Sequence, residues 1–423
     1  MNYCKVITDE KLEYNQLLEE FQLGCKTEEK IGMEYERIPL SKKNKTQIPY
    51  EGDFGVAELL KEFANADNWD YILDAQSVIG LKKNHDTITL EPGCQFELSL
   101  EPQFLIKDLK EKIENIDSKL KPLLEEFDIE LANIGISPIT TYKNIKLIPK
   151  KRYHVMADYL WGILSDVMMR ETAGIQVGID YRSEEDAIRK FQLANKIMPF
   201  MTAIYTNSNI RGGVDTGYRS FRALSWLNTD SERCGFATNF KKDMTFKDYV
   251  DMLLNSPMIF INRDDYPVSI NGRLTFKQFM EKGFEGFSAD INDWKLHSNL
   301  YFPEVRLRNF IEIRNHDCVG GGLEYSIPAF YKGIFYSKTA LEDAEALMDK
   351  FTVNEIKELR YNVAKSGIRS KINKKTILPI CKDLMEISLY GLKSKNENEM
   401  KYLEPAIEML SQGKSPCDYN KIK

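Results

Sequence analysis

Apolar residues recur along the chain at two different spacings, and each spacing predicts an element of secondary structure. Three- and four-residue steps within residues 104–124 predict an amphipathic helix. Its apolar positions are Leu105, Leu109, Ile113, Ile116, Leu120 and Leu124. A second helix is predicted to begin at Ser183, within a capping-box pattern, and Pro199 is expected to kink or end it. From about Ser337 onwards the pattern is helical throughout and predicts a packing layer with few chemical groups.

Between these helices lie short segments in which apolar and polar residues alternate, as in strands that bury one face. Glycine-rich turns between a strand and a helix do not recur, so the pattern does not favour a doubly wound parallel sheet. We therefore predict an α+β fold with an antiparallel sheet. No linker divides the chain, and we expect a catalytic core over residues 1–336 and a helical packing region of the same domain over 337–423.

The polar faces of the predicted strands carry an unusual set of side chains. Residues that share a face are Glu34 and Glu36; Gln95, Glu97 and Ser99; Gln176, Gly178 and Asp180; Glu304, Arg306 and Arg308; and Glu312 and Arg314. Any one of these faces is typical of a half-solvated sheet. Together, however, they lack lysine and are rich in glutamate, which binds hard cations, and in arginine, which binds phosphate. The bias favours a single surface that holds a divalent cation and a nucleotide.

Composition and the absence of several known motifs exclude some classes of protein and some modes of nucleotide binding. With 58 basic and 64 acidic residues the net charge is -6, which gives no reason to expect a nucleic-acid partner. No apolar run is long enough for a membrane span, and residues 1–10 do not resemble a secretion signal. Seven scattered cysteines favour free thiols in a reducing compartment, so we expect a cytoplasmic protein. There is no Walker A or kinase loop, and ATP would be held by metals and side chains.

Several longer motifs resemble one family. Residues 90–99, LEPGCQFELS, resemble the LEPGGQFELS stretch of the plant and proteobacterial type of glutamate–cysteine ligase. Residues 302–308, FPEVRLR, preceded by Asp293, Trp294 and His297, are similar to the DWxxH…FPEVRLK segment of that family. Arg152-Tyr153 and Ser220-Phe221-Arg222 also follow in the family's order. Several long motifs in one order are more specific than any single short pattern.

The resemblance implies a glutamine-synthetase-like fold in which an open antiparallel sheet, surrounded by helices, forms an active-site funnel. It implies ATP-dependent ligation of the glutamate γ-carboxylate to the amine of L-cysteine through a γ-glutamyl phosphate, the first step of glutathione synthesis. It also implies Mg²⁺, or Mn²⁺, held by Glu34, Glu36, Glu91, Glu97 and Glu304. By the same resemblance, ATP would contact Gln176, Arg306 and Arg314, the substrate would contact Arg152, Thr172 and Arg222, and the catalytic residues would be Arg222 and Arg306.

The sequence departs from the family pattern at Gly178, at Cys94 and over residues 315–324. These departures leave other functions open: a related ligase with another acceptor amine or carboxylic acid, a phosphotransferase that stops at the acyl phosphate, or a catalytically silent nucleotide-binding homologue. The expected partners are small molecules (ATP, L-glutamate and L-cysteine), without nucleic acid or membrane, and the expected state is a monomer or homodimer.

Overall fold

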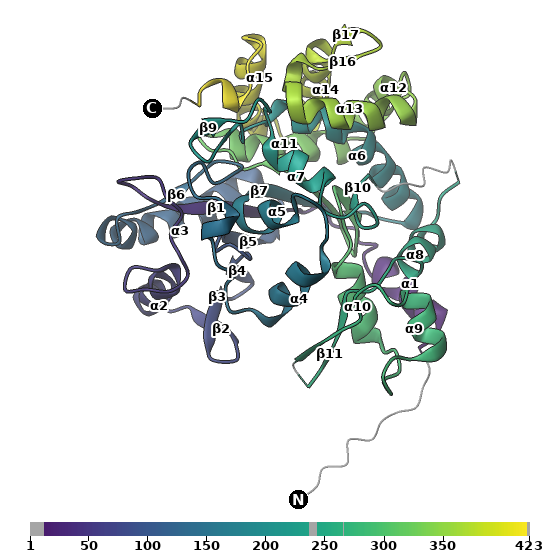
Figure 1. Cartoon of the computed structure of the whole chain (residues 1–423). Coiled ribbons are helices and arrows are strands. Elements are labelled where there is room, and N and C mark those ends of the chain that lie inside the picture. The colour runs from purple at the N-terminus through teal and green to yellow at the C-terminus, as the bar shows by residue number, and fades with distance from the viewer. Residues whose placement is uncertain (1–11, 237–242, 265, 421–423) are drawn as a thin grey trace, which may run out of the picture.

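A computed structural model describes residues 12–236, 243–264 and 266–420 and contains a nine-stranded sheet (Figure 1). Its strands, in spatial order, are β14 (Val305–Leu307), β15 (Ile311–Asp317), β7 (Gly174–Ile179), β1 (Ile31–Ser41), β5 (Phe96–Gln103), β4 (Asp86–Leu90), β3 (Ser77–Lys83) and β2 (Asp70–Asp74), with β6 (Ile129–Ala132) paired to the end of β1. The described pairings within this sheet are all antiparallel, which confirms the predicted α+β class.

One face of the sheet is apolar and is covered by helices. They are α2 (Val56–Asp67), α3 (Ile106–Glu126), α6 (Glu184–Ile204) and α11 (Leu323–Phe335). Helix α3 buries Leu109, Ile113, Ile116 and Leu120, so the predicted amphipathic helix is confirmed. Both terminal nitrogens of Arg37, on this face of β1, donate to the Asp117 carboxylate of α3 at 2.7 and 2.8 Å.

The predicted helix from Ser183 is also confirmed, because the Ser183 hydroxyl accepts a hydrogen bond from the Asp186 amide at the start of α6. Pro199 does not end that helix, which continues to Ile204. The second half of α6 is buried, so its tertiary packing compensates for the backbone hydrogen bond that Pro199 cannot make.

The C-terminal region forms a second layer over α6 and α11, at the top of the molecule in Figure 1. Its helices are α12 (Lys338–Met348), α13 (Val353–Ser366), α14 (Leu378–Asn396) and α15 (Glu404–Ser411). The stripe of Leu341, Ala344 and Met348 is buried, as predicted. The expectation of helix throughout is wrong, because a short hairpin joins β16 (Lys371–Ile372) to β17 (Lys375–Thr376).

The remaining elements surround the polar face of the sheet. They are α1 (Tyr14–Gln22), α4 (Lys151–Tyr159), α5 (Ser165–Glu171), α7 (Phe221–Leu227), α8 (Phe246–Leu254), α9 (Phe276–Lys282) and α10 (Ile291–Asn299), with the short pairs β8 (Ile210–Arg211) and β9 (Val214–Asp215), β10 (Cys234–Gly235) and β13 (Phe302–Pro303), and β11 (Phe260–Arg263) and β12 (Tyr266–Ser269). Short 3₁₀ helices span Tyr142–Asn144, Gly367–Arg369, Glu397–Tyr402 and Pro416–Asp418. Across the described ranges, no helix is both long and apolar enough to cross a bilayer.

The turn between β4 and β5 is packed against the end of α5. The side-chain amide of Gln95 donates to the carbonyls of Met169 (3.1 Å) and Thr172 (2.7 Å), and its oxygen accepts from the Gly93 amide at 2.8 Å. A Cβ on Gly93 would lie 2.1 Å from the carbonyl oxygen of Arg170. Only glycine therefore allows this approach, which fixes the backbone beside Glu91.

We predict that Gly93→Ala destabilises the protein by about 3 kcal/mol, because backbone rather than a flexible side chain must move to admit the methyl group. Urea unfolding would measure the loss. Gly32→Ala is the matched control, since its added Cβ would meet no atom closer than 3.6 Å. Equal unfolding midpoints for the two variants would contradict the role of the turn.

Candidate active site

The register of the sheet brings distant polar side chains into rows. Gln176 of β7, Glu34 of β1 and Ser99 of β5 are neighbours in one row. Glu36 lies directly opposite Glu97 in the next. Because side chains alternate along each strand, the members of both rows share the polar face, as the sequence predicted.

Apart from Ser99, the members of these rows, Glu34, Gln176, Glu36 and Glu97, line a cavity of about 360 Å³. Its walls are completed by residues from helices α4, α5, α7 and α10 and from strands β14 and β15. Of the residues predicted to act, the cavity brings together Glu34, Glu36, Glu91, Glu97, Arg152, Thr172, Gln176, Arg222, Arg306 and Arg314. Its carboxylates come from β1, β5 and the turn after β4 and form what we call the acidic side, and its arginines come from α4, α7, β14 and β15 and form the basic side.

Hydrogen bonds orient the carboxylates on the acidic side. Glu36 accepts from the Gly174 amide (2.6 Å) and the Gln176 side chain (2.9 Å). The hydroxyl of Thr89 donates to Glu97 at 2.7 Å, and that of Tyr153 donates to Glu91 at 3.1 Å. Each bond uses part of the capacity of its carboxylate and leaves further lone pairs for a ligand.

Burial and mutual repulsion disfavour the charged forms of these carboxylates. Burial and the negative charge of Glu312 raise the pKa of Glu34 to about 7. Burial, together with the charges of Glu34, Glu91 and Glu36, raises the pKa of Glu97 well above its usual value. Nearby carboxylates that resist ionisation together are stabilised by a cation placed among them.

Glu312 has the opposite environment, although it lies on the same face. Its carboxylate pairs with Arg306 (2.9 Å), Arg308 (3.2 Å) and Arg314 (3.2 Å). Burial alone would raise the pKa of Glu312, but the three guanidinium charges outweigh it and hold the pKa at about 2. Glu312 is therefore a fixed anion that organises the arginines.

The arginines differ in how far their donors are already used. Arg306 donates to Glu312 and to the carbonyls of Asn299 (2.8 Å) and Tyr301 (3.0 Å), so most of its guanidinium is occupied. Arg314 lies 5.2 Å from the ring centroid of Trp226. Such packing holds the planar group in one orientation.

Arg222 enters the cavity from the first turn of α7. Its Nη2 donates to the Arg314 carbonyl at 2.9 Å, while its buried Nε has no partner among the described residues. A Cβ on Gly174 would lie 2.3 Å from Nη2, so this glycine makes room for the guanidinium. Burial lowers the pKa of Arg222, and the nearby Glu36 opposes that change. An anionic ligand would satisfy both the free donor and the buried charge.

Arg152 and Thr172 lie on the wall of the same cavity. Arg152, in α4, contacts the Tyr153 hydroxyl at 3.4 Å. Thr172 follows α5, and its hydroxyl donates to the Met168 carbonyl at 2.6 Å. Met156 of α4 and Met169 of α5 add apolar side chains to the lining of this cavity. This wall combines one cation with apolar surface.

A second cavity of about 340 Å³ adjoins the first and shares Glu34, Gln176 and Glu312 with it. Gly32 and Gly178 are cross-strand partners on its floor, so no side chain rises from the sheet there. A Cβ on Gly178 would lie 3.1 Å from the ring of Phe310, which also lines this space. Gly178, one of the positions at which the sequence departs from the family pattern, thus lines the second cavity.

Glu304 is not brought into either cavity. It lies between β13, which pairs with β10, and β14, which pairs with β15, so the chain is not one continuous strand through residues 302–308. Its carboxylate forms an ion pair with the buried Arg360 of α13. The prediction that the C-terminal region carries few chemical groups missed this arginine.

The predicted set of five glutamates is therefore not a ready-made metal cage. Within residues 12–236, 243–264 and 266–420, no three His, Cys, Asp or Glu side chains are arranged to hold a metal ion by themselves. The six described cysteines are free thiols, while Cys4 lies outside the described residues.

Sequence reasoning placed Glu312 and Arg308 on a polar strand face but gave neither a role. The signal was present in the alternation of Glu312 with Arg314, yet a strand pattern cannot show which residues from another strand lie opposite. Tyr153 was noted only inside a motif, and Trp226 was given no role. Both contact charged residues of the cavity.

Comparison with known proteins agrees with this geometry. The model of the glutamate-cysteine ligase family 2 (GCS2) matches residues 30–419. The chloroplastic glutamate–cysteine ligases of Medicago truncatula and Nicotiana tabacum are each 31% identical to this chain over 98% of its length, and the chain covers 82% and 80% of them. The crystal structure of a Francisella tularensis glutamate–cysteine ligase in complex with AMP shares the fold, with a TM-score of 0.53 and 12% identity over 93% of this chain and 84% of that one.

The fold and the two-sided cavity are those of a carboxylate–amine ligase, and the chain is an enzyme of this class. It belongs to the glutamate-cysteine ligase family 2. The expectation of a cytoplasmic protein is wrong by this comparison, because the similar plant enzymes are named as chloroplastic.

We predict that Glu304→Gln destabilises the fold by about 3–5 kcal/mol, because it leaves the buried Arg360 charge without its partner. The double variant Glu304→Leu with Arg360→Met should recover much of this loss, since apolar residues can replace a buried ion pair. Denaturant unfolding measures both. If Glu304→Gln unfolds like the wild type yet loses metal-dependent activity, Glu304 is a ligand rather than a structural residue.

Proposed function

We propose that this chain uses ATP to join the γ-carboxylate of glutamate to the amine of cysteine, the first step of glutathione synthesis. The observation that carries the proposal is that one cavity brings glutamates of β1, β5 and the turn after β4 together with arginines of α4, α7, β14 and β15. This arrangement suits a metal-bound triphosphate on one side and an anionic amino acid on the other. The family of the chain and the names of its relatives support the same reaction.

The nucleoside of ATP is assigned to the second cavity and the phosphates to the junction of the two. The floor of Gly32 and Gly178 is open enough for a flat base, and the Phe310 ring lies beside it. From there, the phosphates would extend over Glu34 and Gln176 towards Arg314. The AMP in the structurally similar Francisella enzyme supports nucleotide binding on this fold.

The carboxylates fit a hard divalent cation, with Mg²⁺ as the first choice and Mn²⁺ as the second. Glu34, Glu36, Glu91 and Glu97 offer oxygen ligands, and the repulsion among them is relieved by positive charge. Mg²⁺ usually takes only one or two carboxylates and completes its shell with water and phosphate, which agrees with the lack of a complete protein cage. When bound, it would neutralise charge on the triphosphate.

The reaction requires two displacements. The glutamate γ-carboxylate attacks the γ-phosphorus of ATP and displaces ADP, giving γ-glutamyl phosphate. The cysteine amine, after loss of a proton, then attacks the acyl carbon, and phosphate leaves with the bonding electrons. Arg314 is assigned to the charge on the transferred phosphoryl group, and Arg222, with its unpaired Nε, is assigned to the reacting γ-carboxylate of glutamate.

The remaining assignments follow from position in the cavity. Arg152 and Thr172 would hold an amino-acid substrate through its α-carboxylate and amine. Arg306, whose donors are mostly occupied, would act by orienting Glu312 rather than by direct contact. Because the arginines are fixed before substrate arrives, little reorganisation is needed during the reaction.

The main test uses purified protein with ATP, Mg²⁺ and glutamate, with and without cysteine, and reads both ADP and γ-glutamylcysteine. We expect stoichiometric ADP and peptide only when cysteine is present. Peptide formation with a different amine, and none with cysteine, would overturn the choice of acceptor. ADP release at full rate without any acceptor would indicate a phosphotransferase.

We predict that Glu97→Gln lowers kcat/KM for ATP by roughly 100-fold, a typical cost of removing one group that stabilises charge in the transition state. Glu130→Gln, on strand β6 of the same sheet, is the control and should retain activity, because Glu130 pairs with Lys45 outside the cavity. Raising the Mg²⁺ concentration should partly restore the Glu97 variant. Equal loss in both variants would contradict a local role for Glu97.

We further predict that Gly178→Asn raises KM for ATP roughly tenfold, because the new side chain must displace the Phe310 ring into the second cavity. KM for glutamate should change little. Steady-state kinetics with each substrate varied in turn would measure both constants. A rise in KM for glutamate alone would place the nucleoside elsewhere.

A further inference from the structure

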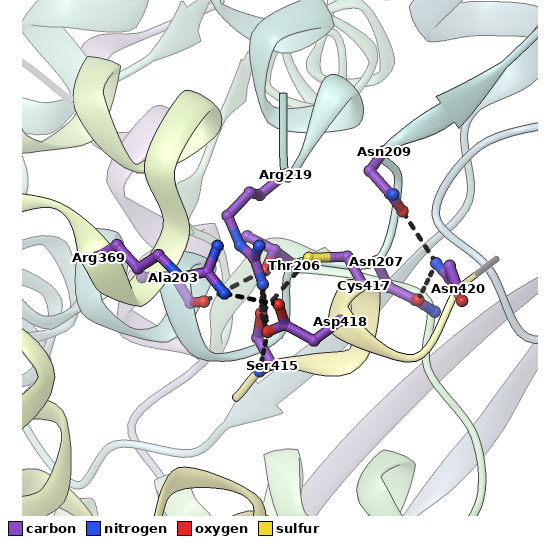
Figure 2. A network of polar contacts seen from close by, with 10 residues as sticks. All are labelled: Ala203, Thr206, Asn207, Asn209, Arg219, Arg369, Ser415, Cys417, Asp418 and Asn420. Atoms are coloured by element: carbon purple, nitrogen blue, oxygen red, sulfur yellow. Dashed lines mark hydrogen bonds and ion pairs between the residues drawn. The ribbon is translucent and has the colours of Figure 1, made fainter. Parts of the chain in front are cut away.

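The last described residues of the chain are tied to the segments on either side of β8 and β9 (Figure 2). Ser415 begins the 3₁₀ helix Pro416–Asp418, and its amide donates to the Asp418 carboxylate at 2.9 Å. That carboxylate also pairs with Arg219 and, at 2.9 Å, with Arg369. Asp418 therefore joins three separate parts of the chain.

Further bonds attach the same C-terminal segment, residues 415–420, to the end of α6. The Thr206 hydroxyl donates to the Ser415 hydroxyl at 2.9 Å, and Thr206 is completely buried. The Asn420 amide donates to the side-chain oxygens of Asn207 (3.0 Å) and Asn209 (3.1 Å), as Figure 2 shows. These partners immediately surround Ser208.

A buried carboxylate connects this region to the active site. Asp317 accepts hydrogen bonds from the Asn207 amide (2.7 Å), the Ser208 hydroxyl (2.6 Å) and the Ser220 hydroxyl (2.8 Å). Ser220 is the N-cap of α7, and Ser208 accepts from the Arg222 amide at 3.1 Å. The path from the C-terminal segment to the cavity is thus continuous through described contacts.

Helix α7 needs such support because it has only seven residues. Helices this short are not stable on their own and take their position from tertiary contacts. Arg219, directly before the N-cap Ser220, is held on both sides: its amide bonds to the Ala364 carbonyl at 3.0 Å and its guanidinium pairs with Asp418. Both groups of this ion pair are mostly buried, so its contribution is less screened by water than that of an exposed pair.

We infer that the C-terminal segment positions Arg222, and that Asp418 and Arg219 are positioning residues for the binding of the amino-acid substrate. The inference rests on the proposed function, since it takes Arg222 to contact that substrate. ATP, assigned to the sheet side of the cavity, should depend much less on this segment. If the segment had only a structural role, perturbing it would weaken the binding of both substrates to the same extent.

The test compares Asp418→Asn with Arg369→Gln in the full-length protein. The first removes the charge that holds Arg219, while the second removes a mostly exposed partner of the same carboxylate that lies away from α7. We expect Asp418→Asn to raise KM for glutamate about tenfold, as small misplacements of binding groups do, with KM for ATP within about twofold of wild type. Arg369→Gln should leave both constants near their wild-type values.

Hydrogen exchange provides a readout that does not depend on catalysis. Amides of α7 should exchange roughly tenfold faster in Asp418→Asn than in wild type or Arg369→Gln. If Asp418→Asn does not fold, Arg219→Gln replaces it. Arg219→Lys, which keeps the charge, should then retain more glutamate affinity than Arg219→Gln.

Three results would overturn the inference: unchanged exchange of α7 together with unchanged KM for glutamate, an equal rise in KM for both substrates, or the same effects in Arg369→Gln. Failure of the proposed function is distinct from these, because the wild-type protein would then form no γ-glutamylcysteine. The exchange of α7 would still report whether the C-terminal segment holds it.

Discussion

Carboxylates are forced together on the polar face of the sheet, where little water reaches them. Glu36 and Glu97 are direct cross-strand partners, an arrangement that costs stability when both are charged. Burial and repulsion raise the pKa of each, with Glu34 and Glu91 contributing to the same field. The strain is relieved when positive charge enters. Under the proposed function, this positive charge would be a cation that arrives with the triphosphate.

Two carboxylates on this same face have very different pKa values, although the sequence pattern does not distinguish them. Glu34 and Glu312 share both cavities, yet their pKa values lie at about 7 and about 2. The difference comes from the three arginines that pair with Glu312. The charge of Glu312 is therefore neutralised by ion pairs with guanidiniums, which it holds in place. Among the described residues, Glu34 has no such set of ion pairs, so its protonation depends more on the charge of a bound ligand.

Much of the acidic side could be predicted from the sequence because it depends on a period of two. Once Glu34, Glu36 and Glu97 are on antiparallel strands, alternation alone gives them a common face. Glu304 shows the limit of this reasoning. The chain changes strand partner at that residue, and its counter-ion Arg360 comes from a helix more than fifty residues later. No local sequence pattern shows either the change of strand partner or the distant counter-ion.

The predicted compartment was also wrong, because cysteine usage reports the redox state of a compartment and not its identity.

The basic side of the cavity is built differently from the acidic side. Arg222 stands on a two-turn helix, and its position depends on Asp317, Ser208 and Ser220, which in turn lie against the C-terminal segment. Helix α13 approaches the same place from outside, where Arg360 reaches both Glu304 and the Ala223 carbonyl of α7. Neighbouring strands thus fix the side chains on the sheet through their register, while Arg222 depends on long-range side-chain contacts. The two halves of the site can therefore be perturbed separately, which is what a two-substrate ligase needs if its nucleotide and amino-acid affinities are to be set independently.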